Sequence, residues 1–122
     1  MTHYDVIIVG AGPAGMSAAN ILKDKKSVLI VDEYYHYGGR LLGELYEESK
    51  DSWWNGMDVA RRLHDGLDEK ITLRLETSVF NVDRNDGAFT VYTNKGNFTS
   101  DYLIVATGAK ENSYPLPGWE LP

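Results

Sequence analysis

Cysteine is absent from the 122 residues of this chain. Its absence excludes disulfide bonds, thiolate metal sites, cysteine nucleophiles and a dithiol redox relay within the chain. No apolar run approaches the ~20 residues that a membrane helix requires. Residues 1–5 also lack the basic start and apolar stretch of a signal peptide. We therefore expect a cytoplasmic location and no membrane partner.

Positive charge is scarce as well. Lys and Arg total 12 against 18 Asp and Glu, which gives a formal net charge of −6. A chain of this charge repels phosphate backbones and anionic headgroups, so nucleic acid is not expected as a partner. With 43% hydrophobic and 25% charged residues, the composition is that of a globular protein with a real core. The length corresponds to one domain over residues 1–122.

Residues 4–33 have the pattern of a strand, a helix and a second strand. Val6–Val9 is an uninterrupted β-branched run, which is typical of a strand covered on both faces in a parallel sheet. Apolar side chains then recur at helical spacing as far as Leu22, and Ser27–Val31 is a second apolar run. We expect two adjacent parallel strands joined by a helix in a right-handed crossover.

The remaining pattern predicts an α/β fold with about four parallel strands, flanking helices and a small meander. Its expected elements are a loop with a short helix near 40–48, a helix over 57–67, a third parallel strand over 71–75, a three-stranded antiparallel meander over 79–98 that covers one face of the sheet, and a buried strand over 102–106. Residues 34–56 are otherwise expected to be irregular.

Gly10, Gly12 and Gly15 have G-x-G-x-x-G spacing immediately after the first strand and at the start of the helix. In this context Gly10 permits the tight turn, Gly12 leaves room for a pyrophosphate, and Gly15 lets the helix pack close to the strand. Free N–H groups and the helix dipole then favour a phosphate, and Pro13 is tolerated in the first turn. The alternative is a glycine turn that merely connects strand to helix.

Asp32 and Glu33 end the second strand, at about the 20-residue spacing from Gly10 at which a carboxylate accepts hydrogen bonds from ribose hydroxyls. The spacing does not choose between the two acids. Either carboxylate disfavours a 2′-phosphate, which makes NADP the least suitable dinucleotide for this site. The alternative for each acid is a solvated strand end.

No residue has the pattern of a catalytic group in its own right. His3, His36 and His64 are scattered, without a carboxylate or metal-ligand partner at motif spacing. The clusters Tyr34–Tyr37 and Trp53–Trp54 are compatible with lining a cofactor, with an interface, or with packing under the long loop. We therefore predict no catalytic residue and no metal site.

Taken together, the motifs resemble those of a known family. The segments that carry the resemblance are Tyr4–Gly15, Val31–Glu33, Gly38–Arg40, Val105–Ala109 and Pro115–Trp119. They resemble the N-terminal FAD-binding segment of the pyridine nucleotide-disulfide oxidoreductase superfamily, the two-dinucleotide-domain flavoproteins. Within it, the chain is most similar to the α subunits of the sarcosine oxidase, opine oxidase and hydrogen cyanide synthase group and to thioredoxin reductase-like proteins. The resemblance implies a Rossmann-like FAD-binding fold, incomplete relative to the full family domain.

The resemblance also implies roles for individual residues. Glu33, five residues before Gly38 as in the family pattern, is expected to hold the adenosine ribose, and the backbone of Val79 is expected to contact adenine. The FAD pyrophosphate and ribityl chain are expected along Gly10, Gly12, Pro13, Ala14, Gly15, Gly38, Gly39 and Arg40. Ala106, Thr107 and Gly108 are expected to turn the chain beside the cofactor.

The sequence departs from the family pattern in three ways. Leu41–Gly43 follow Gly-Gly-Arg where disulfide reductases of the glutathione reductase type place a redox cysteine. The later Gly-Asp motif near the flavin and the NAD(P)H-binding domain are both missing, so we expect a chain truncated before that domain. The leading hypothesis is the FAD-binding part of a flavin oxidoreductase that uses NAD(P)H or an amine-type donor and is inactive alone.

Two other functions stay open. One is a non-catalytic nucleotide-binding or assembly module, because an incomplete sheet with an uncovered edge favours a homodimer or a partner subunit. The other is half of an NAD-binding dehydrogenase, which the meander before Ala106 and the Pro-Gly-Trp tail make less suitable.

Overall fold

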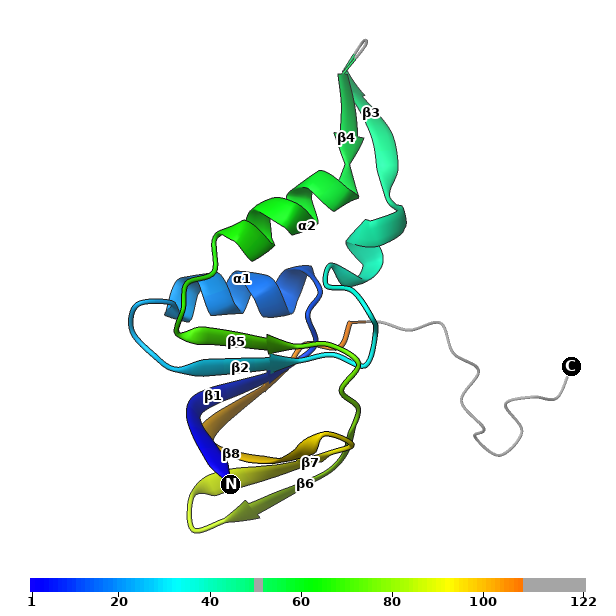
Figure 1. Cartoon of the computed structure of the whole chain (residues 1–122). Helices are drawn as coiled ribbons and strands as arrows, with labels where there is room; N and C mark the ends of the chain where they lie inside the picture. The colour runs from blue at the N-terminus through cyan, green and yellow to red at the C-terminus, as the bar shows by residue number, and fades with distance from the viewer. Residues whose placement is uncertain (50–51, 109–122) are drawn as a thin grey trace, which may run out of the picture.

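A single six-stranded sheet is the framework of the molecule. The computed structural model describes residues 1–49 and 52–108, and its main sheet has the order β5-β2-β1-β8-β7-β6 (Figure 1). The strands are β1 Thr2–Val9, β2 Val28–Val31, β5 Ile71–Arg74, β6 Val79–Asn85, β7 Ala88–Thr93 and β8 Gly96–Val105. β5, β2, β1 and β8 are parallel, whereas β6, β7 and β8 form an antiparallel meander. The predicted α/β fold is confirmed.

The two faces of the parallel strands are covered by different layers. Val6, Ile8, Val28 and Ile30 pack with Ala19 of helix α1 Pro13–Leu22. On the opposite face, the core joins residues of the parallel strands to the meander, and its buried members are Ile7, Leu29, Val31, Val91 and Phe98. The strands are apolar at successive positions because both faces are buried, and each such side chain contributes about 1.5–3 kcal/mol. The meander therefore covers one face, as predicted.

Strand β8 corrects one expectation. The last meander strand and the buried run over 102–106 were expected to be separate, but they are one ten-residue strand. Its first half pairs with β7 as far as Ser100, while the stretch from Phe98 to Val105 lies alongside β1. Because no Gly or Pro interrupts residues 97–105, nothing in the local sequence breaks the strand between its two pairing partners.

Residues 39–55 correct another expectation. Instead of an α-helix near 40–48, the chain forms a short 3₁₀ helix, η1 Gly39–Gly43, and a hairpin of β3 Leu45–Ser49 with β4 Ser52–Asn55. Tyr and Trp in this stretch favour strands, and Gly43 ends the helical turn early. The hairpin is a separate two-stranded sheet that stands away from the main sheet beyond α2 Gly56–Asp65 (Figure 1).

The two helices are joined by polar and aromatic contacts. The Asn20 side-chain amide donates to the carbonyl oxygens of Met16 in α1 and Leu63 in α2, both at 2.9 Å. Tyr37 stacks on His64 of α2 with ring centroids 4.3 Å apart, and Tyr37 also packs against two of the apolar cores. For Tyr37 and His64, the structure therefore supports a packing role.

A reciprocal pair of hydrogen bonds ties the middle of β1 to the residue that precedes β2. The Ser27 N–H donates to the Asp5 carboxylate at 2.8 Å, and the Asp5 N–H donates to the Ser27 hydroxyl at 2.9 Å. The Ser27 backbone amide stabilises the ionised carboxylate and holds the pKa of Asp5 below its usual value. This pair fixes the register with which the helix returns the chain to the sheet.

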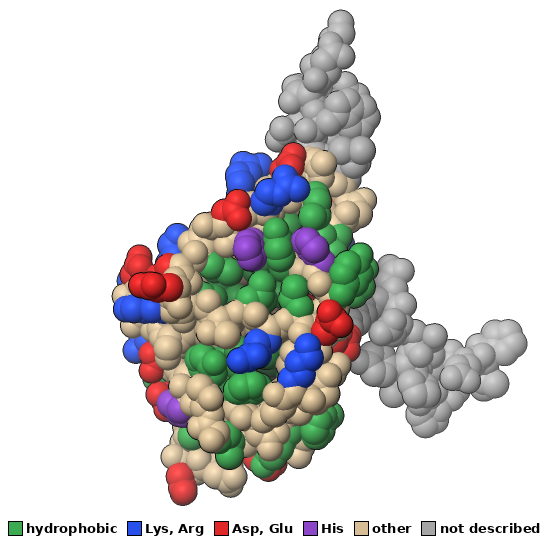
Figure 2. Space-filling model, viewed as in Figure 1, with side chains coloured by type: hydrophobic (Ala, Val, Ile, Leu, Met, Phe, Trp, Pro, Cys, Tyr) green, Lys and Arg blue, Asp and Glu red, His purple; other side chains and the backbone are tan. Residues whose placement is uncertain are grey.

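Charged side chains of both signs are spread over the face of the molecule seen in Figure 2. Lys and Arg side chains occur there in small separate groups, with acidic side chains interspersed. Within the part of the chain that the structure describes, no helix is long and apolar enough to cross a membrane.

Candidate nucleotide-binding site

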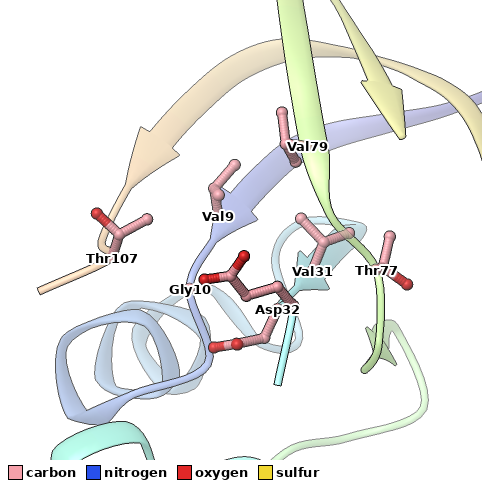
Figure 3. A pocket seen from close by; sticks show the side chains of 8 residues that line it. Val9, Gly10, Val31, Asp32, Thr77, Val79 and Thr107 are labelled. Atoms are coloured by element: carbon pink, nitrogen blue, oxygen red, sulfur yellow. The ribbon is translucent and has the colours of Figure 1, made fainter. Parts of the chain in front are cut away.

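A cavity of about 150 Å³ opens at the carboxyl ends of the parallel strands β1, β2 and β8. It is lined by Val9, Gly10, Val31, Asp32, Glu33, Thr77, Val79 and Thr107 (Figure 3). Open α/β sheets bind ligands at this end of their strands, where the loops converge. Five of the eight lining residues, namely Gly10, Asp32, Glu33, Val79 and Thr107, are among the predicted site residues.

Gly10 lies where β1 ends, between the neighbouring strands. Its N–H donates to the Val31 carbonyl at 2.8 Å, and its φ is +119°. A Cβ built on Gly10 would overlap the carbonyl oxygen of Ala106, and Ala106 in turn donates its N–H to Val9 at 2.8 Å. Both the backbone conformation and the packing therefore require glycine here.

Gly15 is required by packing alone. It is buried in the first turns of α1, and a Cβ at this position would overlap the carbonyl oxygen of Gly10 and lie 3.2 Å from the Ile8 side chain. The helix therefore lies directly against the strand that precedes it. This close approach is the role that the spacing predicts for the third glycine of the motif.

Gly12 differs from both. Its φ of −85° and ψ of −168° are extended backbone that any residue adopts. The nearest atom to a Cβ built there is the Gly39 Cα at 3.8 Å, an ordinary contact distance. Neither the conformation nor the surrounding atoms of the described chain require glycine at this position. Gly12 instead leaves an open space beside Gly39, the cradle, which a side chain would fill.

The amino end of α1 is open to an anion. Gly12 is the N-cap residue and makes no side-chain capping bond, Pro13 opens the helix, and the first turn contains no acidic residue. Ala14 is exposed beside it. The N–H groups and the dipole at such a helix start favour a phosphate group.

The structure separates the two adjacent acids. The Asp32 carboxylate accepts the Ala11 N–H at 2.7 Å and the Tyr34 N–H at 2.9 Å, one on each oxygen. Glu33 is exposed and lines the same cavity. The Asp32 carboxylate is therefore turned toward residues 10–12, the glycine loop (Figure 3), while Glu33 is one of the residues that line the cavity.

The other predicted residues divide into two groups. The Gly38 N–H donates to the Ala11 carbonyl at 2.7 Å, and Gly39 approaches Gly12, so the Gly-Gly pair borders the glycine loop. Arg40 instead is exposed, forms a 3.5 Å ion pair with Glu44, and does not line the cavity. Gly108 is exposed and is also not among the lining residues.

Three lining residues were not predicted: Val9, Val31 and Thr77. Val9 and Val31 are the last residues of β1 and β2, directly before Gly10 and Asp32. Their positions next to the predicted turn and acid could therefore have identified them as lining residues. Thr77 is buried, its hydroxyl donates to the Leu75 carbonyl at 2.9 Å, and its N–H donates to the Asp32 carbonyl at 2.8 Å. No motif marks Thr77, because its place in the cavity depends on the β5–β6 connection crossing the end of β2.

No histidine or tyrosine in the described part of the chain lines the cavity. His3 contacts Thr99 and Asp101 in the middle of β8, and His64 contacts Asp65. His36 borders a second, open hollow together with Tyr34 and Tyr35. Trp53 and Trp54 lie in β4, where the structure does not describe side chains. Among the described residues, no group of three His, Asp or Glu side chains is placed to hold a metal ion.

The parallel sheet, its strand–glycine turn–helix unit and the cavity beside the second strand together define a dinucleotide-binding domain of the Rossmann type. A family model of pyridine nucleotide-disulphide oxidoreductases matches residues 4–121. The chain belongs to this family, and its members are flavoproteins.

Individual relatives agree with this assignment. The chain is 31% identical to an opine oxidase subunit from Agrobacterium tumefaciens, over 98% of this chain and 26% of the relative. It is similar to the structure of L-proline dehydrogenase from P. horikoshii, with a TM-score of 0.79 and 29% identity over 88% of this chain and 23% of that one. For T. acidophilum thioredoxin reductase the TM-score is 0.75, and the identity is 29% over 97% of this chain and 40% of that one. The chain thus spans about a quarter to two fifths of the length of these relatives.

Proposed function

We propose that this chain binds FAD and forms the FAD-binding part of a flavin-dependent oxidoreductase. The observation that carries the proposal is Gly12, which borders the open start of α1 although neither its backbone angles nor its neighbours require glycine. A bound pyrophosphate explains why a side chain is absent there. The residues present fit the cofactor, because Gly12 and the start of α1 leave room for a pyrophosphate and Glu33 lines the cavity at the end of β2.

Each part of the cofactor has a proposed set of contacts. The exposed carboxylate of Glu33 accepts hydrogen bonds from the adenosine ribose, and the backbone of Val79 borders adenine. The pyrophosphate lies between the start of α1 and Gly39, with Pro13 and Ala14 beside it. The ribityl chain and the flavin lie beside Ala106–Gly108, directly after β8. A contact of Arg40 with the ribityl chain is also part of the proposal, and it requires the Arg40 side chain to leave its ion pair with Glu44.

The chemistry of such an enzyme resides in the cofactor. Bound flavin supplies hydride or electron transfer between a donor, here NAD(P)H or an amine-type compound, and an acceptor. The residues of this chain bind and orient FAD, and we assign none of them to catalysis. We therefore propose that the chain does not turn over by itself, and that substrate contacts come from polypeptide beyond it.

The test is the identity of the nucleotide that the purified protein releases on denaturation. We expect FAD, identified by chromatography and by its absorbance and fluorescence spectra, in a protein that does not sustain NAD(P)H oxidation with an artificial acceptor. Release of NAD or NADP in place of FAD would contradict the proposed cofactor. Repeated turnover by the isolated chain would contradict the proposed inactivity.

A second candidate function, an assembly module, is favoured by the second half of β8, which has no strand partner on its β7 side among the described residues. β7 pairs with β8 only as far as Ser100, whereas β8 continues to Val105. Tyr102 and Val105 in this free stretch are 65% and 68% exposed. An unpaired, apolar strand edge favours strand addition from a second polypeptide. We expect a dimer or a complex with a partner subunit in sedimentation experiments, and a strictly monomeric mass at high concentration would contradict assembly through copies of this chain.

A further inference from the structure

Asp32 joins three segments that line the nucleotide cavity. Its carboxylate accepts the Ala11 N–H of the glycine loop at 2.7 Å and the Tyr34 N–H of the segment after β2 at 2.9 Å. Its own carbonyl accepts the Thr77 N–H of the β5–β6 connection at 2.8 Å. The glycine loop, the segment that follows Glu33 and the β5–β6 connection are therefore all hydrogen-bonded to Asp32.

We propose that Asp32 is the positioning residue of this site: its carboxylate holds the glycine loop and the segment after β2 at the separation that a diphosphate nucleotide requires, without contacting the ligand. The inference rests on the proposed function, since it concerns the same cavity. It assigns adjacent acids to different tasks: Glu33 is exposed and lines the cavity, and the Asp32 carboxylate is turned toward the main chain.

The hydrogen bonds explain why an aspartate suits this position. Two backbone N–H groups point at it from opposite sides, and an ionised carboxylate is acceptor-only, with one oxygen for each. Asparagine has the same shape but a single acceptor oxygen, so its NH₂ group would face one of the two N–H donors. Asp32→Asn therefore separates the glycine loop from the segment after β2 while changing almost no volume.

Charge and position predict opposite effects for this substitution. A carboxylate beside the glycine loop repels the phosphates of a bound nucleotide. If Asp32 acted only through its charge, Asp32→Asn would strengthen nucleotide binding. If it acts by holding the loop, the same substitution weakens binding. The sign of the change in affinity thus distinguishes the two roles.

The experiment is a calorimetric titration, with ADP and with 2′-deoxy-ADP, of protein from which bound nucleotide has first been removed; the two probes differ only in one ribose hydroxyl. For Asp32→Asn, we expect both affinities to fall about tenfold or more, because a hydrogen bond to a charged acceptor is lost, with their ratio unchanged. Glu33→Gln is the matched neighbour, and there we expect the preference for ADP over 2′-deoxy-ADP to decrease. A general loss of structure would not lower both affinities equally in Asp32→Asn and change their ratio in Glu33→Gln.

Two further measurements cover a poorly folded Asp32→Asn. Asp32→Glu keeps the charge and both acceptor oxygens but moves them by one methylene, so we expect it to fold and to weaken ADP and 2′-deoxy-ADP equally. Hydrogen exchange of the Ala11 amide should be slow in the unsubstituted protein and faster in Asp32→Asn or Asp32→Glu.

Several outcomes would overturn the inference. These are unchanged or tighter ADP binding in both Asp32 variants, a change in the ratio between the two nucleotides, and an Ala11 amide that exchanges freely in the unsubstituted protein. Failure of the unsubstituted protein to bind ADP at all is a different result, because it would overturn the proposed function and this inference with it.

Discussion

Gly12→Val is expected to abolish FAD binding in a protein that still folds. The φ and ψ of Gly12 are extended angles that suit a β-branched residue, and a Cβ there meets nothing closer than 3.8 Å. We therefore expect the main cost to the fold to be a poorer helix N-cap, about 1 kcal/mol in the unfolding free energy. The valine methyl groups, however, occupy the space through which the pyrophosphate approaches the first turn of α1. Flavin content after purification and a titration with added FAD measure the loss.

Ser17→Val provides the matched control. Ser17 is exposed in the same helix, one turn further along, so this variant adds the same branched side chain to α1 away from the cradle. We expect it to retain FAD and to melt close to the unsubstituted protein. Normal FAD binding by Gly12→Val would show that the phosphates lie elsewhere, whereas equal loss of FAD in both variants would point to a damaged helix.

The strand–turn–helix–strand unit was predictable because its local and long-range requirements coincide. Val6–Val9 favours a strand by itself, and burial on both faces demands the same residues. The glycine spacing similarly encodes two constraints of the chain, at Gly10 and Gly15, and one proposed constraint of a ligand, at Gly12. The sequence pattern alone does not distinguish these reasons, which became separable only when the neighbours of each glycine were known.

The parts that were not predictable depend on contacts between distant segments. The β3–β4 hairpin replaced an expected helix because pairing partners across a turn decided the conformation of a stretch with mixed preferences. Thr77 joined the cavity through the path of the β5–β6 connection. The proposed division of roles between Asp32 and Glu33 likewise rests on the hydrogen bonds of the Asp32 carboxylate to the main chain, which the 20-residue spacing rule does not contain.

Gly15→Ala is expected to destabilise the fold strongly, in contrast to Gly12→Val three residues earlier. The added methyl would overlap the Gly10 carbonyl oxygen, which belongs to the backbone. Gly10 itself is fixed by its hydrogen bond to Val31 and by the Ala106 carbonyl beneath it. Neither partner can rotate away, so α1 must shift from β1 and its buried contacts must loosen. We expect a loss of about 3 kcal/mol in the unfolding free energy and a melting temperature about 10 °C lower.

Gly43→Ala is the control for this variant, because it adds the same methyl group where no atom lies within 4 Å and where φ is not in the left-handed region. Urea denaturation followed by circular dichroism should leave Gly43→Ala near the unsubstituted protein and move the midpoint of Gly15→Ala to lower urea. A Gly15→Ala protein with an unchanged midpoint would mean that α1 lies further from β1 than the structure places it. The contrast matters for the site as well, since loss of FAD in Gly15→Ala would follow from loss of the fold, whereas in Gly12→Val it would occur with the fold intact.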